Sequence, residues 1–186
     1  MNLEVRRATP DDLSGVLDVF LDCWRESYRG VLPASAIDAM TDERAEALWR
    51  RVLADTTGVV LVAVAVDVDV DAAIDAPVDA AEGDGRVVGI TRYAVATGTD
   101  AGAVEGAVHS LYVSPRAHGG GVGTLLLSRA TDELRAAGAA AATLWVFAAN
   151  APSIGFYESR GWLPDGATRT QADFGEPEQR MRREWT

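Results

Sequence analysis

A strand that ends in a glycine-rich turn, followed at once by an amphipathic helix, is the feature that most constrains the fold of this chain. The segment reads Leu111-Tyr112-Val113-Ser114-Pro115-Arg116-Ala117-His118-Gly119-Gly120-Gly121-Val122-Gly123-Thr124. Its glycines let backbone amides converge without obstruction by Cβ atoms, and the start of a helix adds unpaired N–H donors and a partial positive charge. The segment therefore predicts a phosphate-binding junction between a sheet and a helix, and the alternative is a flexible surface turn.

The absence of lysine excludes several known kinds of phosphate-binding site. All 17 are arginine and none is lysine, which excludes a P-loop lysine and a lysine linkage to pyridoxal phosphate. A dinucleotide-binding Rossmann site is disfavoured because the glycines do not follow G-x-G-x-x-G and the flanking strands are predicted to be antiparallel. The predicted cradle is thus made by backbone amides.

Length, charge and cysteine content limit the number of domains and the classes of partner and cofactor that this chain can have. A chain of 186 residues, 48% hydrophobic, is expected to form one domain over residues 1–186. The net charge of -11 argues against a nucleic-acid partner. With one cysteine, Cys23, and two histidines, neither a disulfide nor a metal site is expected. No apolar stretch suits a membrane span or a signal peptide, so we expect a cytoplasmic protein; a homodimer is left open.

Hydrophobic periodicity predicts an α/β chain. Strands are expected at residues 3–8, 58–66, 86–96, 104–113, 143–147, 161–164 and 178–184. Helices are expected from Thr9 to the breaks at Gly30 and Pro33, at 42–54, from Val122 to Gly138, and between an Asn150 cap and Gly161. Strand 58–66 is apolar throughout and is expected to be covered on both faces, and strands 86–96 and 104–113 suggest an antiparallel meander. The Arg-rich last strand is expected at an edge.

An acidic stretch interrupts this pattern. Residues 67–85 are rich in Asp and Ala and carry little that a core could bury. We interpret the stretch as an exposed loop inserted between two strands.

Two motifs together resemble the GNAT superfamily of N-acetyltransferases. Its first signature, Arg or Gln, two residues, Gly, one residue, then Gly or Ala, is similar to His118-Gly119-Gly120-Gly121-Val122-Gly123, with His118 as the departure. The second, an Asn, a short helix with Phe-Tyr, then Gly and an aromatic, is similar to the segment from Asn150 through Phe156-Tyr157 to Gly161-Trp162. The resemblance also covers 24–33 and 163–167, and thus nearly the whole chain apart from the acidic stretch.

The resemblance implies a fold and a cosubstrate. The fold would be a mixed, mostly antiparallel sheet of six to seven strands with helices on both faces. Acetyl-CoA would be the cosubstrate, its pyrophosphate on the turn amides, its pantetheine arm along the strand end and at Asn150, and no metal would be required. The implied coenzyme-binding residues are Leu111, Tyr112, Val113, His118, Gly119, Gly120, Gly121, Val122, Gly123, Thr124, Asn150, Ser153 and Tyr157.

The catalytic groups are less well marked. By resemblance, Tyr157 protonates the departing thiolate. The family often has a base on the strand before the turn, but Ala107 occupies the place where we would look for it. Glu105, two residues earlier on the same strand face, is the first candidate, directly or through water, and His109 is the second. The acceptor pocket is expected to be walled by Trp24, Tyr28, Trp145 and Phe147, with Glu26 to attract a cationic amine.

These observations predict an N-acetyltransferase acting on a primary amine of a small molecule or a peptide. Two alternatives stay open. One is a non-catalytic acyl-CoA-binding or regulatory module, which the apolar Ala107 favours, and the other is a transferase of a longer acyl group.

Overall fold

One seven-stranded sheet organises the chain in a computed structural model that describes residues 2–66, 85–97, 104–172 and 174–185. The strand order is β1-β2-β3-β4-β5-β7-β6. The strands are β1 (Asn2–Arg7), β2 (Val59–Val66), β3 (Arg86–Thr97), β4 (Val104–Val113), β5 (Ala141–Phe147), β6 (Leu163–Thr170) and β7 (Pro177–Glu184). The helices are α1 (Leu13–Asp22), α2 (Ala34–Asp38), α3 (Asp42–Ala54), α4 (Val122–Ala136) and α5 (Ala151–Glu158).

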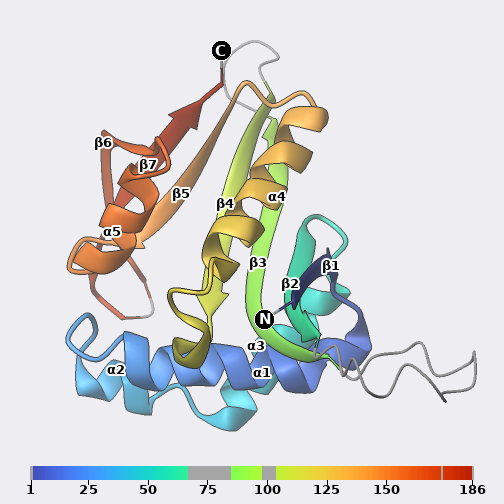
Figure 1. Ribbon diagram of the computed structural model, residues 1–186. Helices are drawn as coiled ribbons and strands as arrows, with labels where there is room; N and C mark the ends of the chain where they lie inside the picture. The colour runs from blue at the N-terminus through green and yellow to red at the C-terminus, as the bar shows by residue number, and fades with distance from the viewer. Residues whose placement is uncertain (1, 67–84, 98–103, 173, 186) are drawn as a thin grey trace, which may run out of the picture.

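The sheet has two antiparallel arms joined by one parallel pair. Strands β1 to β4 form an antiparallel arm, and β5, β7 and β6 form another. Between them β4 and β5 run parallel, pairing only from Glu105–Ala141 to Val108–Leu144. Beyond Val108 the two strands diverge, so the sheet opens into a wedge (Figure 1).

Helices cover both faces of the first arm, as predicted. Strand β2 shows why: Leu61 and Ala63 pack into the core that contains α4, and Val60, Val62 and Val64 into the core beneath α1 and α3. A strand with apolar residues on both faces has to be buried between two layers. The predicted α/β sheet and its antiparallel meander are therefore confirmed.

Two short segments were not anticipated. Helix α1 continues into a π-helical turn, η2 (Cys23–Ser27), and α2 follows it. The predicted helix up to the break at Gly30 includes η2, but its π-helical form was not predicted, and α2, which follows Pro33, is too short to show a clear period.

The prediction that the last strand lies at an edge is wrong. Strand β7 lies between β5 and β6, and the edge belongs to β6, which is longer than the predicted 161–164. The arginines of β7 are accommodated there by acids of the same sheet, including Asp165 of the neighbouring β6 for Arg180 and Glu105 of β4, beyond β5, for Arg182. Ion pairs of this kind let a polar sequence occupy an internal strand.

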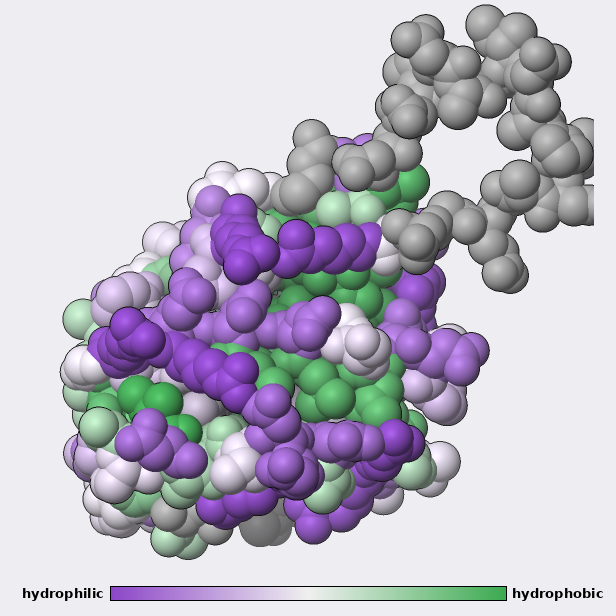
Figure 2. Space-filling view, turned by 90° about the horizontal axis from the view of Figure 1, so that it is seen from below, coloured by the Kyte–Doolittle hydropathy of each residue, from purple (hydrophilic) through white to green (hydrophobic). Residues whose placement is uncertain are grey.

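The helical lower face is hydrophilic for the most part. Exposed charged residues of α3, among them Asp42, Glu43 and Arg50, lie there, and Figure 2 shows hydrophobic side chains between hydrophilic ridges. No helix in the described part of the chain is long and apolar enough to cross a bilayer. Residues 67–84 of the predicted acidic insert lie outside the described residues, so that interpretation stays a prediction.

Candidate active site

The wedge between β4 and β5 positions the site. A β-bulge places His109 as an extra residue of β4, opposite the step from Arg92 to Tyr93 in β3. After the bulge Leu111 and Val113 pack toward the α4 side, and Tyr112 packs toward the α1 side. The bulge and the end of β5 pairing thus present the last residues of β4 to two cavities.

The larger cavity, the glycine-turn cleft, has a volume of about 940 Å³ and lies where β4 runs into α4. Gly119 and Gly121 have φ values of 77° and 81°, and a Cβ atom on either would meet open space. The first bond of α4 runs from the Leu125 amide to the Gly121 carbonyl at 3.0 Å. The amides of Val122, Gly123 and Thr124 precede that bond and remain at the helix start, where an anion is favoured.

The turn is braced by side chains from the same cleft. His118 Nε2 lies 3.0 Å from the Val113 carbonyl oxygen, and the Cys23 thiol donates to the same carbonyl at 2.9 Å. Burial raises the pKa of Cys23 to about 12, so the group is a thiol at neutral pH. His118 therefore closes the turn through β4, which gives this departure from the family signature a structural role.

Arg160 adds a cation to the cleft that sequence reasoning missed. Its guanidinium lies 3.8 Å above the Phe156 ring and donates to Thr124 Oγ1 at 2.6 Å. Arg160 Nε is buried and has no hydrogen-bond partner among the described residues. In the sequence Arg160 is only a single arginine just before Gly161, and the fold alone brings it to Thr124 at the start of α4.

The smaller cavity, called here the β5–β7 cavity, has a volume of about 250 Å³ and is lined by residues of β4, β5, β6 and β7. Aromatic residues form its wall: Trp24, Tyr28, Trp145, Phe147 and Phe174. Its polar lining includes His109, Arg169, Gln171 and Glu178. An apolar wall with a few convergent polar groups is typical of a small-molecule site.

The two cavities meet inside the wedge. Both are lined by Tyr28, Leu111, Tyr112, Asn150, Ser153 and Tyr157. Burial raises the pKa of Tyr157, and likewise of Tyr28 and Tyr112, above the ordinary tyrosine value, so these hydroxyls keep their protons. No described residue forms a hydrogen bond with the Tyr157 hydroxyl. A protonated, unengaged hydroxyl thus stands where a group from one cavity would meet a group from the other.

The comparisons with known proteins agree with this geometry. Residues 67–162 match the family model described as Acetyltransferase (GNAT) family. The chain belongs to the GNAT family. No curated protein matches it in sequence.

Solved structures share the whole GNAT fold. PaiA N-acetyltransferase from Thermoplasma acidophilum, solved in complex with coenzyme A, is 17% identical with a TM-score of 0.70, and the match covers 100% of both chains. The ribosomal-protein-alanine N-acetyltransferase from Brucella melitensis is 24% identical with a TM-score of 0.64, covering 98% of this chain and 99% of that one. At these identities the likeness shows the fold, and together with the family it supports an acyltransferase.

The expected coenzyme residues gather in the glycine-turn cleft, with one exception. All of them line it except Gly120, whose amide donates to the Ala117 carbonyl at 3.2 Å. Asn150 Oδ1 accepts a hydrogen bond from the Ser153 amide at 3.2 Å, so Asn150 is confirmed as the N-cap of α5. The same residue lines both cavities. A pantetheine contact by Asn150 stays a prediction.

The expected acceptor residues divide between the cavities. Trp24 and Phe147 line the β5–β7 cavity, Tyr28 lines both, and Glu26 lines the glycine-turn cleft. Rings connect them, with Tyr28 5.2 Å from Trp24 and 5.7 Å from Phe147 between centroids. The π-helical turn η2 supplies Trp24, and Tyr28 follows immediately after it.

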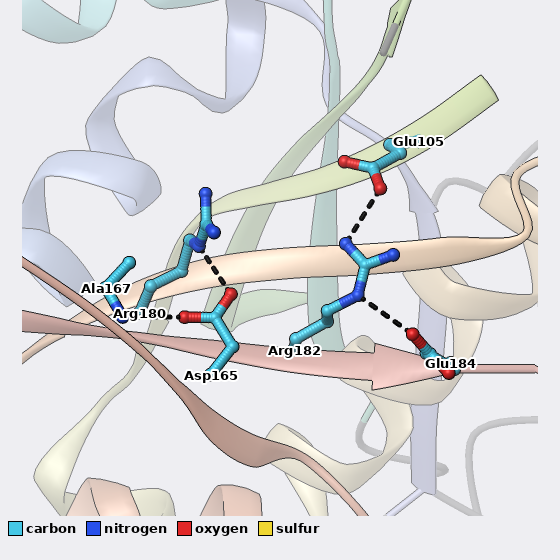
Figure 3. A network of polar contacts seen from close by, with 6 residues as sticks. All are labelled: Glu105, Asp165, Ala167, Arg180, Arg182 and Glu184. Carbon is cyan, nitrogen blue, oxygen red and sulfur yellow. Dashed lines mark hydrogen bonds and ion pairs between the residues drawn. The ribbon is translucent and has the colours of Figure 1, made fainter. Parts of the chain in front are cut away.

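Glu105, the first candidate for the base, lies away from both cavities. It is at the far end of β4, about 20 Å of strand from Leu111. Its carboxylate accepts a hydrogen bond from Arg182 at 2.7 Å, within a row of ion pairs across β4, β7 and β6 (Figure 3). Glu105 still pairs with Ala141 there, before the wedge opens, so the geometry gives no support to its expected role as the base.

His109, the second candidate, lies in the β5–β7 cavity. Burial lowers its pKa, with Arg92 acting in the same direction and Asp55 against it, so the ring is neutral near pH 7. Among the described residues no cluster of three or more His, Cys, Asp or Glu side chains is arranged for a metal ion.

Proposed function

We propose that this protein transfers the acetyl group of acetyl-CoA to a primary amine of a small molecule or a peptide. The observation that carries the proposal is the meeting of two cavities at Tyr157. The glycine-turn cleft would bind the pyrophosphate through the amides at the start of α4 and Arg160. The β5–β7 cavity would bind the acceptor through its aromatic wall and its polar groups.

The fit to coenzyme A rests on the cradle itself. Gly119 and Gly121 have positive φ in the turn that leads into α4, and the space beside both glycines is open. A side chain at either position would occupy that space. Arg160, which donates to Thr124 Oγ1, adds a cation beside the helix start in the same cleft.

Bound acetyl-CoA would supply a thioester carbonyl at the junction. Tyr28, Leu111 and Tyr112 exclude water there, and the Tyr157 hydroxyl delivers a proton to the departing sulfur. A covalent acetyl-cysteine is disfavoured because Cys23 is held as a thiol bonded to Val113. The amine therefore attacks the thioester directly.

The test is incubation with acetyl-CoA and a panel of primary amines, followed by mass detection of a product heavier by one acetyl group. Calorimetry on the same protein measures acetyl-CoA binding. Binding without any acetylated product would favour a non-catalytic acyl-CoA-binding or regulatory module. Transfer from longer acyl-CoA molecules alone would favour a transferase of a longer acyl group. No binding at millimolar acetyl-CoA would overturn the proposal.

A further inference from the structure

The β5–β7 cavity contains one acid that no motif pointed to. Glu178 is 7% exposed and lies on β7 opposite Phe147 of β5. Directly opposed residues of antiparallel strands project from the same face, so Glu178 and Phe147 reach the cavity together. Glu178 is the only acid among the described residues that line this cavity.

The carboxylate is held in place by a stacked arginine. Arg169 Nε donates to Glu178 Oε2 at 2.6 Å, and the guanidinium lies 4.2 Å above the Trp145 ring. A buried carboxylate is costly unless it is paired, and Arg169 provides the pair from the half-exposed side. Glu178 is therefore an oriented anion at the wall of a cavity.

The rest of the wall suits an apolar body attached to a cation. Phe174 lies 5.1 Å from Trp24 between ring centroids, and Tyr28 connects Trp24 to Phe147. Aromatic rings attract cations as well as apolar groups. The volume of 250 Å³ equals about eight molecules of liquid water, which limits the occupant to a small molecule or the end of a larger one.

We propose that Glu178 binds the ammonium group of the acceptor and takes up its proton, which makes the preferred acceptor a small monoamine with an apolar or aromatic body. The inference rests on the proposed acetyl transfer. One proton of the ammonium passes to the Glu178 carboxylate and on to solvent. The freed nitrogen forms a bond to the thioester carbon as the C–S bond breaks. Tyr157 protonates the sulfur, and the second proton lost by the nitrogen restores Tyr157.

The variant that tests this is Glu178→Gln, which keeps the shape and can still accept from Arg169. Its matched control is Asp165→Asn, because the Asp165–Arg180 pair has the same 2.6 Å length in the same β6–β7 hairpin but lines neither cavity. The ligands are 2-phenylethylamine and its neutral counterpart 2-phenylethanol, titrated by NMR with coenzyme A present. A thermal melt of each variant reports folding.

We expect Glu178→Gln to weaken binding of 2-phenylethylamine at least tenfold and to leave 2-phenylethanol within twofold. Asp165→Asn should change neither. In turnover with 2-phenylethylamine, Glu178→Gln should lower kcat/KM about a hundredfold with acetyl-CoA affinity unchanged. Absence of amine binding to the wild type, or equal effects of the two variants, would overturn the inference. A lower melting temperature with intact kcat/KM would likewise reduce Glu178 to a hairpin ion pair.

The rival base is tested by His109→Gln. If that variant loses turnover while Glu178→Gln retains it, the proton goes to His109 and the assignment of Glu178 is wrong. Failure of the acetyl-transfer proposal looks different, since acetyl-CoA would then yield no product with any amine.

Discussion

Two glycines beneath α4 allow a matched test of the coenzyme cradle. A Cβ atom on Gly89 would lie 2.6 Å from Val122 Cγ1 and 2.9 Å from Leu126 Cδ1, under the first turn of the helix. A Cβ atom on Gly106 would lie 2.7 Å from Leu134 Cδ1, under its last turns. Because carbon contacts are normally about 3.5–4.0 Å, each alanine has to displace the facing side chains by about 1 Å, and we expect its end of α4 to move outward with them. Only the first turn carries the proposed cradle.

Gly89→Ala and Gly106→Ala should therefore cost similar stability but differ in affinity. Val122, Leu126 and Leu134 are fully buried, so overpacking should cost about 1–3 kcal/mol and lower Tm by roughly 2–12 °C. Displacing the amides at the helix start should remove a charged hydrogen bond of about 1.5–3 kcal/mol, a tenfold to hundredfold loss of acetyl-CoA affinity in Gly89→Ala alone.

Thermal melts measure the first effect and calorimetric titration with acetyl-CoA the second. Equal loss of affinity in both variants would show that general loosening of α4, not displacement of its first turn, weakens binding. Unchanged affinity in a destabilised Gly89→Ala would place the pyrophosphate elsewhere.

Three other predictions follow from single side chains. Tyr157→Phe should lower kcat about a hundredfold with little change in acetyl-CoA affinity, and steady-state kinetics showing unchanged kcat would leave water as the proton donor. Arg160→Gln should weaken acetyl-CoA binding roughly tenfold with a salt dependence smaller than wild type, measured by titration at two ionic strengths. Asp12→Asn should lower the free energy of unfolding by about 1–2 kcal/mol at pH 7. Burial by itself would raise the pKa of Asp12, but hydrogen bonds from Arg6 and Thr9 bring that pKa below its ordinary value. That stability is present above the unfolded pKa and lost as pH falls through the folded value, so denaturation curves of the two proteins should converge below about pH 4.

Local backbone chemistry was readable from the sequence. Asn150 caps α5 and Gly161, at φ 78°, ends it, because capping and left-handed turns depend on a few adjacent residues. The glycine turn before Val122 was readable for the same reason. The apolar run of β2 indicated a buried central strand, since only a strand covered on both faces needs that composition.

Which charged residues line the β5–β7 cavity was decided by tertiary structure alone. Glu178 reaches the cavity because β7 inserts between β5 and β6 and pairs it with Phe147. Glu105 lines neither cavity because the wedge opens only beyond Val108. Strand order and register depend on the packing of whole faces, and the sequence around either glutamate carries no trace of them. The sequence by itself thus determined the family and the backbone cradle, and only the folded sheet determined which charges face the two cavities.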